Sequence, residues 1–180
     1  MKRITSISFV LIVCSAAVCA QSRLQPTVEQ HVFNLGVDGP VVQHPVGLSD
    51  SELSALANDE TMKQVLDQDP PITEVMREGL ESAVVHLHSS QERDVLVVGS
   101  GDPFHGANIC PFWVIRDLPT GPQVVFSTIA LQVTIQRTSF NGLRNIEAFA
   151  ATAIEGTTAN FRFNGTKYVK CREKSAPLGQ

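Results

Sequence analysis

The chain contains little charge, few aromatic side chains and few cysteines. Of its 180 residues, 18% are charged and 6% aromatic, with one tryptophan, one tyrosine and four cysteines. A hydrophobic content of 43% excludes a disordered chain, and the composition also excludes collagen-like and coiled-coil proteins. The net charge of −4 disfavours nucleic acid as a partner, because phosphate binding needs an excess of lysine and arginine.

Residues 1–20 are predicted to form a secretory signal peptide. A positively charged start precedes the apolar run 4–18, and Ala20 supplies a small residue for cleavage. This run is shorter than the roughly 20 apolar residues that span a bilayer, and no other apolar run is long enough, so we expect no membrane span after cleavage. The mature protein is expected to be secreted or periplasmic. A lipid anchor is the alternative, because Cys14 and Cys19 lie in or beside the apolar run.

The remaining chain is predicted to form one domain between an irregular segment and a loose end. Residues 21–47 are rich in proline and glycine without a sustained period, and residues 175–180 are expected to form a flexible tail. Between them, the domain covers 48–174, with helices over 49–89 and a β-rich part over 94–171. Helices followed by strands predict an α+β fold, in which N-terminal helices pack on an antiparallel meander of about six to seven strands.

Two helices have clear sequence signals. Ser49 and Glu52 match the capping box, which predicts that a helix begins at Asp50. Apolar residues at helical spacing from Ile72 onward predict the longest helix of the chain, which ends near Ser89.

Alternating and aromatic patterns identify strands in the second half of the chain. Apolar residues at alternate positions from Ile129 to Ile135 predict a strand with one face in water, and that face carries Gln132, Thr134 and Gln136. Near the end, Asn164-Gly165 predicts a tight hairpin that turns Phe161 and Tyr168 toward the core.

After signal cleavage, the two remaining cysteines are Cys110 and Cys171. An exported chain with two cysteines usually pairs them, so we expect a disulfide between the start of the meander and its last strand.

The candidates for catalysis are few. Asp102, His105 and Cys110 are close in sequence, which allows a small periplasmic hydrolase that uses His105 with Asp102, or the Cys110 thiol. A disulfide would remove the thiol. His86 and His88 lie in the predicted helix, where residues two apart point in different directions. We therefore expect no metal site, no cofactor and no catalytic residue.

These considerations favour a non-catalytic binding or interaction module. The expected binding surface combines one loop with the wet face of one strand: Phe104, His105, Gln132, Thr134 and Gln136. Its partner is expected to be an envelope or extracellular protein. An envelope-associated structural protein or lipoprotein is a further alternative.

Several short motifs occur together in one order: Gly99-Ser100-Gly101, Asn108-Ile109-Cys110-Pro111-Phe112-Trp113, Asn141-Gly142, and the hairpin from Phe161 to Tyr168. This order resembles a group of secreted bacterial proteins of unknown function, over about residues 95–171. The resemblance implies export and a β-rich domain, and it implies no activity.

Overall fold

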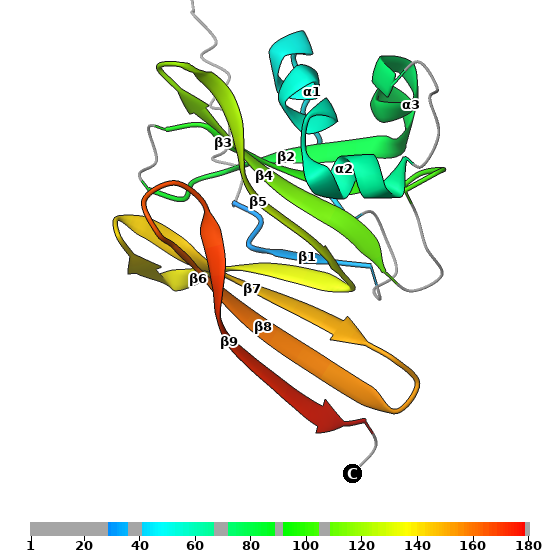
Figure 1. Cartoon of the computed structure of the whole chain (residues 1–180), viewed down its shortest axis with the longest axis vertical. Coiled ribbons are helices and arrows are strands. Elements are labelled where there is room, and N and C mark those ends of the chain that lie inside the picture. Colours follow the sequence, from blue (N-terminus) through cyan, green and yellow to red (C-terminus); the bar gives the residue numbers. More distant parts are fainter. Residues whose placement is uncertain (1–28, 36–40, 67–71, 89–91, 105–108, 179–180) are drawn as a thin grey trace, which may run out of the picture.

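The structure, a computed structural model, describes residues 29–35, 41–66, 72–88, 92–104 and 109–178. Within these ranges the chain forms three short helices and nine strands (Figure 1). The elements are β1 (Val32–Asn34), α1 (Asp50–Ala57), α2 (Glu60–Val65), α3 (Ile72–Gly79), β2 (Leu80–Val85), β3 (Asp94–Gly99), β4 (Cys110–Leu118), β5 (Gly121–Ala130), β6 (Gln132–Phe140), β7 (Leu143–Ala151), β8 (Glu155–Phe163) and β9 (Tyr168–Pro177).

The strands form two antiparallel sheets that pack on each other. One sheet has the order β2-β3-β4-β5 and the other has the order β1-β6-β7-β8-β9. Apolar side chains from both sheets fill the core between them, with Leu96 and Phe112 from the first sheet and Val133 and Ile146 from the second. This core joins the two sheets because each alternates apolar side chains on its inner face.

The three helices cover the other face of the four-stranded sheet (Figure 1). Leu56 and Met62 from the helices pack with Val97 and Trp113 from the strands in a second core. Trp113 is fully buried, and its indole N–H donates to Asp59 Oδ1 at 2.9 Å, which ties the start of α2 to β4. Burial on both faces leaves the four-stranded sheet as the middle of three layers.

The predicted fold class is wrong. Strands make up 54% of the described residues and helices 16%, so the protein is mostly β. The strands do not form one meander, because β5 and β6 follow each other in sequence and belong to different sheets. Only one residue, Leu131, separates these strands, and its backbone bonds to Leu35 and Phe149 of the five-stranded sheet.

The helix predicted from Ile72 to Ser89 is also wrong in its second half, because α3 ends at Gly79 and β2 begins at the next residue. The side chains of Ala83 and Val85 belong to the core between the sheets. The apolar residues of this stretch include positions 80, 83, 84 and 87, whose spacing also fits a helical period, so hydrophobicity alone did not separate the two.

Local signals at chain reversals were more informative. The capping box at Ser49 is present, with the Glu52 carboxylate accepting from the Ser49 backbone N–H at 2.7 Å. Asn141 and Gly142 both have positive φ, as a type I′ hairpin turn requires. The last hairpin differs from its prediction: Phe163 pairs with Tyr168, so the loop has four residues, 164–167, and not the two of a tight Asn164-Gly165 turn. Both Phe161 and Tyr168 contact the ring of Phe126, as expected for residues that face the core.

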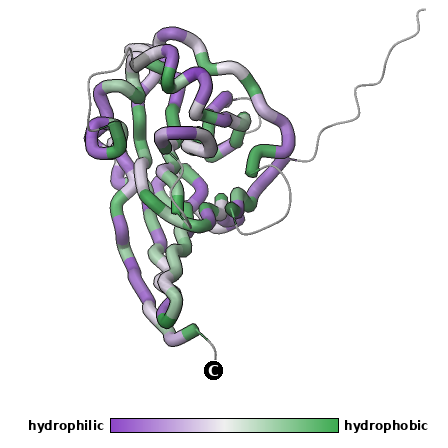
Figure 2. Tube along the Cα trace, turned by 90° about the vertical axis from the view of Figure 1, so that its right-hand side faces the viewer, coloured by the Kyte–Doolittle hydropathy of each residue, from purple (hydrophilic) through white to green (hydrophobic). Residues whose placement is uncertain are grey.

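One end of the five-stranded sheet extends beyond the rest of the molecule. Figures 1 and 2 both show the ends of β8 and β9 forming a narrow arm toward the C-terminus. Strand β9 pairs with β8 as far as Pro177, so pairing continues into the segment expected to be a loose tail over 175–180. The predicted signal peptide, 1–20, lies outside the described residues.

We predict that Gly99→Ala destabilises the protein because this position is enclosed. A Cβ atom at Gly99 would lie 2.4 Å from Cβ of Phe104 and 2.9 Å from Cγ of Pro111. Relieving such contacts should lower the free energy of unfolding in urea by about 1–3 kcal/mol. The control is Gly47→Ala, where a Cβ meets nothing within 4 Å and the change should stay within about 0.5 kcal/mol. Equal losses in the two variants would contradict the packing described.

Candidate functional site

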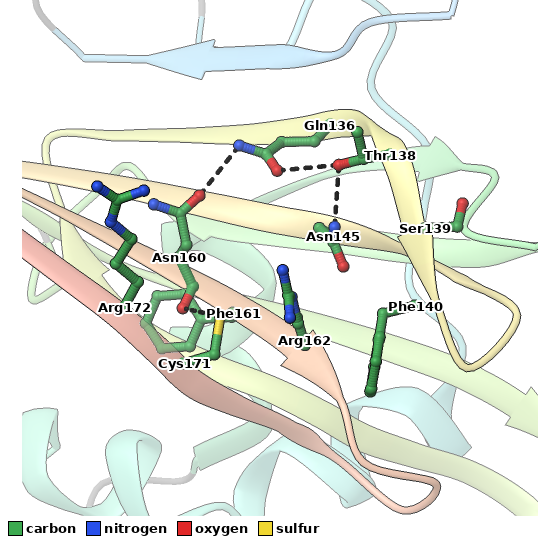
Figure 3. Close-up of a pocket in the computed structure, with 10 residues that line it drawn as sticks. All are labelled: Gln136, Thr138, Ser139, Phe140, Asn145, Asn160, Phe161, Arg162, Cys171 and Arg172. Atoms are coloured by element: carbon green, nitrogen blue, oxygen red, sulfur yellow. Dashed lines mark hydrogen bonds between the residues drawn. The ribbon is translucent and has the colours of Figure 1, made fainter.

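The outer face of the five-stranded sheet, which points away from the four-stranded sheet, contains a polar pocket (Figure 3). Its volume is about 330 Å³. Residues from β6, β7, β8 and β9 line it: Gln136, Thr138, Ser139, Phe140, Asn145, Asn160, Phe161, Arg162, Cys171 and Arg172. We call this the outer-face pocket.

A bulge in β6 shapes the outer-face pocket. Ile135 pairs with Ile146 and Ser139 pairs with Arg144, so the three residues between Ile135 and Ser139 lie opposite Asn145 alone. The extra length of β6 bends it over Asn145, as bulges do when one strand has more residues than its partner. Asn145 is only 9% exposed as a result.

Arg144 stabilises this bulge from the opposite face of the sheet. Its Nε donates to the carbonyl of Gln136 at 2.8 Å, and its Nη2 donates to the carbonyl of Ile135 at 3.4 Å. A bulge leaves such carbonyls without their usual partners in the ladder, and a buried unpaired carbonyl costs free energy. The guanidinium therefore satisfies groups that the neighbouring strand does not.

The same residue connects distant parts of the chain. The Arg144 guanidinium lies 3.4 Å from Glu29 Oε1 and donates to the carbonyl of His86 at 3.3 Å. Its backbone N–H donates to the carbonyl of Leu87, and its own carbonyl accepts from the hydroxyl of Tyr168 at 2.6 Å. Burial raises the pKa of Tyr168, and the charge of Asp94 raises it further, so the phenol remains a donor.

Hydrogen bonds across the outer-face pocket run in one direction. The Glu147 carboxylate can only accept, so Gln136 presents Nε2 to it at 3.1 Å and presents the same nitrogen to Asn160 at 3.2 Å. The Gln136 Oε1 atom then accepts from the hydroxyl of Thr138, whose oxygen accepts from Nδ2 of Asn145 at 2.9 Å.

This chain of bonds leaves one acceptor without a donor. Asn145 Oδ1 is buried and has no hydrogen-bond partner among the described residues. Figure 3 shows it pointing from β7 into the outer-face pocket, toward Arg162. A buried unpaired polar atom costs about 1–3 kcal/mol, so its position requires an explanation.

Two arginines give the outer-face pocket a positive charge. Both Arg162 and Arg172 are exposed, and the guanidinium carbon of Arg162 lies 5.3 Å from the centre of the Phe140 ring. None of the described residues that line the pocket is acidic. The nearest carboxylate on the same face, Glu147, is hydrogen-bonded to Gln136.

A second bulge places Cys171 and Arg172 in the outer-face pocket. Lys170 pairs with Phe161 and Arg172 pairs with Asn160, which leaves Cys171 as the extra residue of β9. Its thiol donates to the carbonyl of Asn160 at 3.3 Å.

The residues of the expected binding surface do not lie together in the structure. Gln132, Thr134 and Gln136 share the outer face of β6, as predicted, and only Gln136 lines the outer-face pocket. Phe104 is 3% exposed and packs edge-to-face on Trp113 with ring centres 6.3 Å apart, so it belongs to the core and not to a surface. His105 lies outside the described residues.

The expected pairing of Cys110 with Cys171 is not seen, and both thiols are free. Cys110 points into the core between the sheets, whereas Cys171 lines the pocket on the outer face. The five-stranded sheet lies between them, which keeps the sulfur atoms apart. Burial, assisted by the charge of Glu81, raises the pKa of Cys110 to about 12. A buried neutral thiol is a poor nucleophile, which argues against the hydrolase based on Cys110.

The other candidate groups are dispersed. Asp102 is exposed on a turn after β3. His86 and His88 follow β2 and not a helix, and each lies near a glutamate, Glu29 and Glu92 respectively. Across the described ranges, no three His, Cys, Asp or Glu side chains are placed to hold a metal ion. No helix in these ranges has the length and apolar character to cross a membrane.

Of the residues that line the outer-face pocket, sequence reasoning assigned only Gln136 to a binding surface, and the residues that it missed include Asn145, Arg162 and Arg172. The alternation around Phe161 and Phe163 does place Arg162 on the wet face of its strand. No sequence signal marks Asn145, because its burial comes from the bulge in a neighbouring strand.

No protein-family model, no curated protein and no solved structure matches this chain. The resemblance to secreted bacterial proteins therefore stays a prediction, and the outer-face pocket must be interpreted from its own chemistry.

We predict that, of the two cysteines that the structure describes, only Cys171 reacts with iodoacetamide in the folded protein, because Cys110 is buried and its pKa is raised. Peptide mapping should find the Cys171 peptide alkylated before unfolding and the Cys110 peptide only after it. In Cys171→Ser, the protein should show no rapid alkylation of Cys110. Recovery of a peptide pair joined by a disulfide between these cysteines would contradict the structure.

We also predict that Arg144→Met lowers the free energy of unfolding by about 2–3 kcal/mol, because several carbonyls and the Glu29 carboxylate lose a charged donor. The control is Arg137→Met, an exposed arginine within the β6 bulge, which should change stability by less than about 0.5 kcal/mol. Urea unfolding gives both values, and similar losses would show that Arg144 has no special role.

Proposed function

We propose that this chain is an exported, non-catalytic binding protein that holds a polar ligand in the outer-face pocket. The N-terminal pattern over residues 1–20 supports export to a secreted or periplasmic location. The observation that carries the binding proposal is the unpaired Oδ1 of Asn145. A ligand that donates a hydrogen bond to this atom would satisfy it.

The surroundings of Asn145 support binding over a purely structural role. A side chain buried for packing has its polar atoms paired, because an unpaired one lowers stability. Here Thr138 holds the amide by Nδ2 at 2.9 Å and so fixes the direction of Oδ1. Such prior positioning of a polar group favours binding, because the ligand does not have to order it.

The lining also has the composition of a site for a polar small molecule. Amide, hydroxyl and guanidinium groups surround the pocket, and Phe140 contributes an aromatic ring. The volume of about 330 Å³ lies at the small end of the range for ligand pockets, about 300–1,000 Å³. A single small molecule, or one residue of a larger one, fits this space.

We predict that Asn145→Leu leaves the free protein as stable as before or stabilises it by up to about 1 kcal/mol, because removing the unpaired Oδ1 offsets the loss of the hydrogen bond from Nδ2 to Thr138. The matched control is Asn160→Leu, on the same face of the next strand, whose Oδ1 accepts from Gln136. Losing that partner should cost about 1 kcal/mol. Urea unfolding measures both changes.

A clear outcome would refute this interpretation. If Asn145→Leu loses as much stability as Asn160→Leu, Oδ1 of Asn145 has a structural partner in solution. The outer-face pocket would then have no group reserved for a ligand, and the proposed function would fail.

A further inference from the structure

We propose that the ligand of the outer-face pocket is a sugar acid, a single carboxylate that carries neutral hydroxyl groups, either free or at the end of a saccharide chain. This inference rests on the proposed function and specifies the chemistry of the same site. Three features of the pocket define the ligand: its charge, its unpaired acceptor and its size.

The charge favours a monoanion. Arg162 and Arg172 contribute two positive charges, and Glu147 contributes one negative charge on the same face through its bond to Gln136. One carboxylate balances this set, whereas a dianion such as a phosphate monoester would be repelled by Glu147. The Arg162 guanidinium carbon lies 5.3 Å from the centre of the Phe140 ring, and the planar fork of N–H donors of an arginine matches the two oxygens of a carboxylate.

The unpaired acceptor requires a donor on the ligand. A carboxylate cannot donate to Asn145 Oδ1, so a second group on the ligand must do so. An ammonium group would face two guanidinium groups in the same pocket, and this repulsion disfavours amino acids. A neutral donor meets this requirement, and a hydroxyl group is such a donor.

Several hydroxyl groups fit better than one. The lining offers the amide of Asn160 and the hydroxyl groups of Thr138 and Ser139 around the same space. Hydroxyl groups both donate and accept, so a ring that carries several of them can bond with amides and hydroxyl groups on different strands. The cavity of about 330 Å³ accommodates one such ring.

The test is calorimetric titration of the full mature protein with four probes of the same ring: glucuronate, glucose, glucosamine and glucose 6-phosphate. We expect glucuronate to bind at least about tenfold more tightly than each of the other three, since glucose and glucosamine offer the arginines no anion and the dianion of glucose 6-phosphate is repelled by Glu147. Methyl glucuronide, with the anomeric carbon blocked, distinguishes a chain-end residue, which it resembles, from the free acid.

Matched variants assign the binding to the outer-face pocket. Arg162→Gln and Arg172→Gln should each weaken glucuronate binding by about tenfold and leave glucose binding unchanged. The control is Lys174→Gln, an exposed cation on β9 that does not line the pocket, and its effect should be less than about twofold. Asn145→Leu should weaken binding of both glucuronate and glucose, because the lost acceptor serves a hydroxyl group.

Three results would overturn the sugar acid assignment. Equal affinity for glucose and glucuronate would show that the pocket does not recognise a carboxylate. Tighter binding of glucose 6-phosphate would show that the pocket prefers a dianion. No binding of glucuronate would exclude sugar acids as ligands. In each case the stability of the Asn145→Leu variant tests separately whether the outer-face pocket binds a ligand at all. If that variant is as stable as the parent, the pocket still reserves an acceptor for another ligand.

Discussion

The guanidinium of Arg144 is the interaction on which both the fold and the outer-face pocket depend. It donates to carbonyls that the β6 bulge leaves unpaired, and it also contacts Glu29 and the carbonyl of His86, which belong to other parts of the chain. A bulge lacks part of its ladder, so it persists only where other donors replace it. Without Arg144, β6 would lose the support that bends it over Asn145.

The residues that hold the strands in place and the residues that line the outer-face pocket lie on opposite faces of the five-stranded sheet. Residues alternate between faces along a strand, so Arg144 and Asn145 point in opposite directions. The inner side has charge pairs, backbone bonds and the packed core, which fix the strands. The outer side holds an amide network that begins at Glu147 and ends at an unpaired oxygen. Rigid support behind an unsatisfied group is the arrangement that a preorganised binding site needs.

Sequence patterns identified much of the local structure and little of the topology. The capping box located α1, and alternation located the wet face of β6, because these signals depend on neighbouring residues. The division into two sheets was missed, since the apolar alternation runs through Leu131 with no turn residue between β5 and β6. The outer-face pocket was missed for a related reason. Burial of Asn145 arises from pairing between strands, and a single strand carries no sign of it.

Strand β9 is the last strand of its sheet, so one side of its backbone has no neighbouring strand within the part of the chain that the structure describes. Such edges invite self-association, and proteins limit it with irregular pairing and cationic gatekeepers. Here the irregularity at Cys171 interrupts the regular ladder, and Lys170, Arg172 and Lys174 line the edge. Arg172 therefore belongs both to the lining of the outer-face pocket and to this edge, where a cation opposes pairing with another strand. Replacing it with a neutral residue would change the pocket and the edge at once.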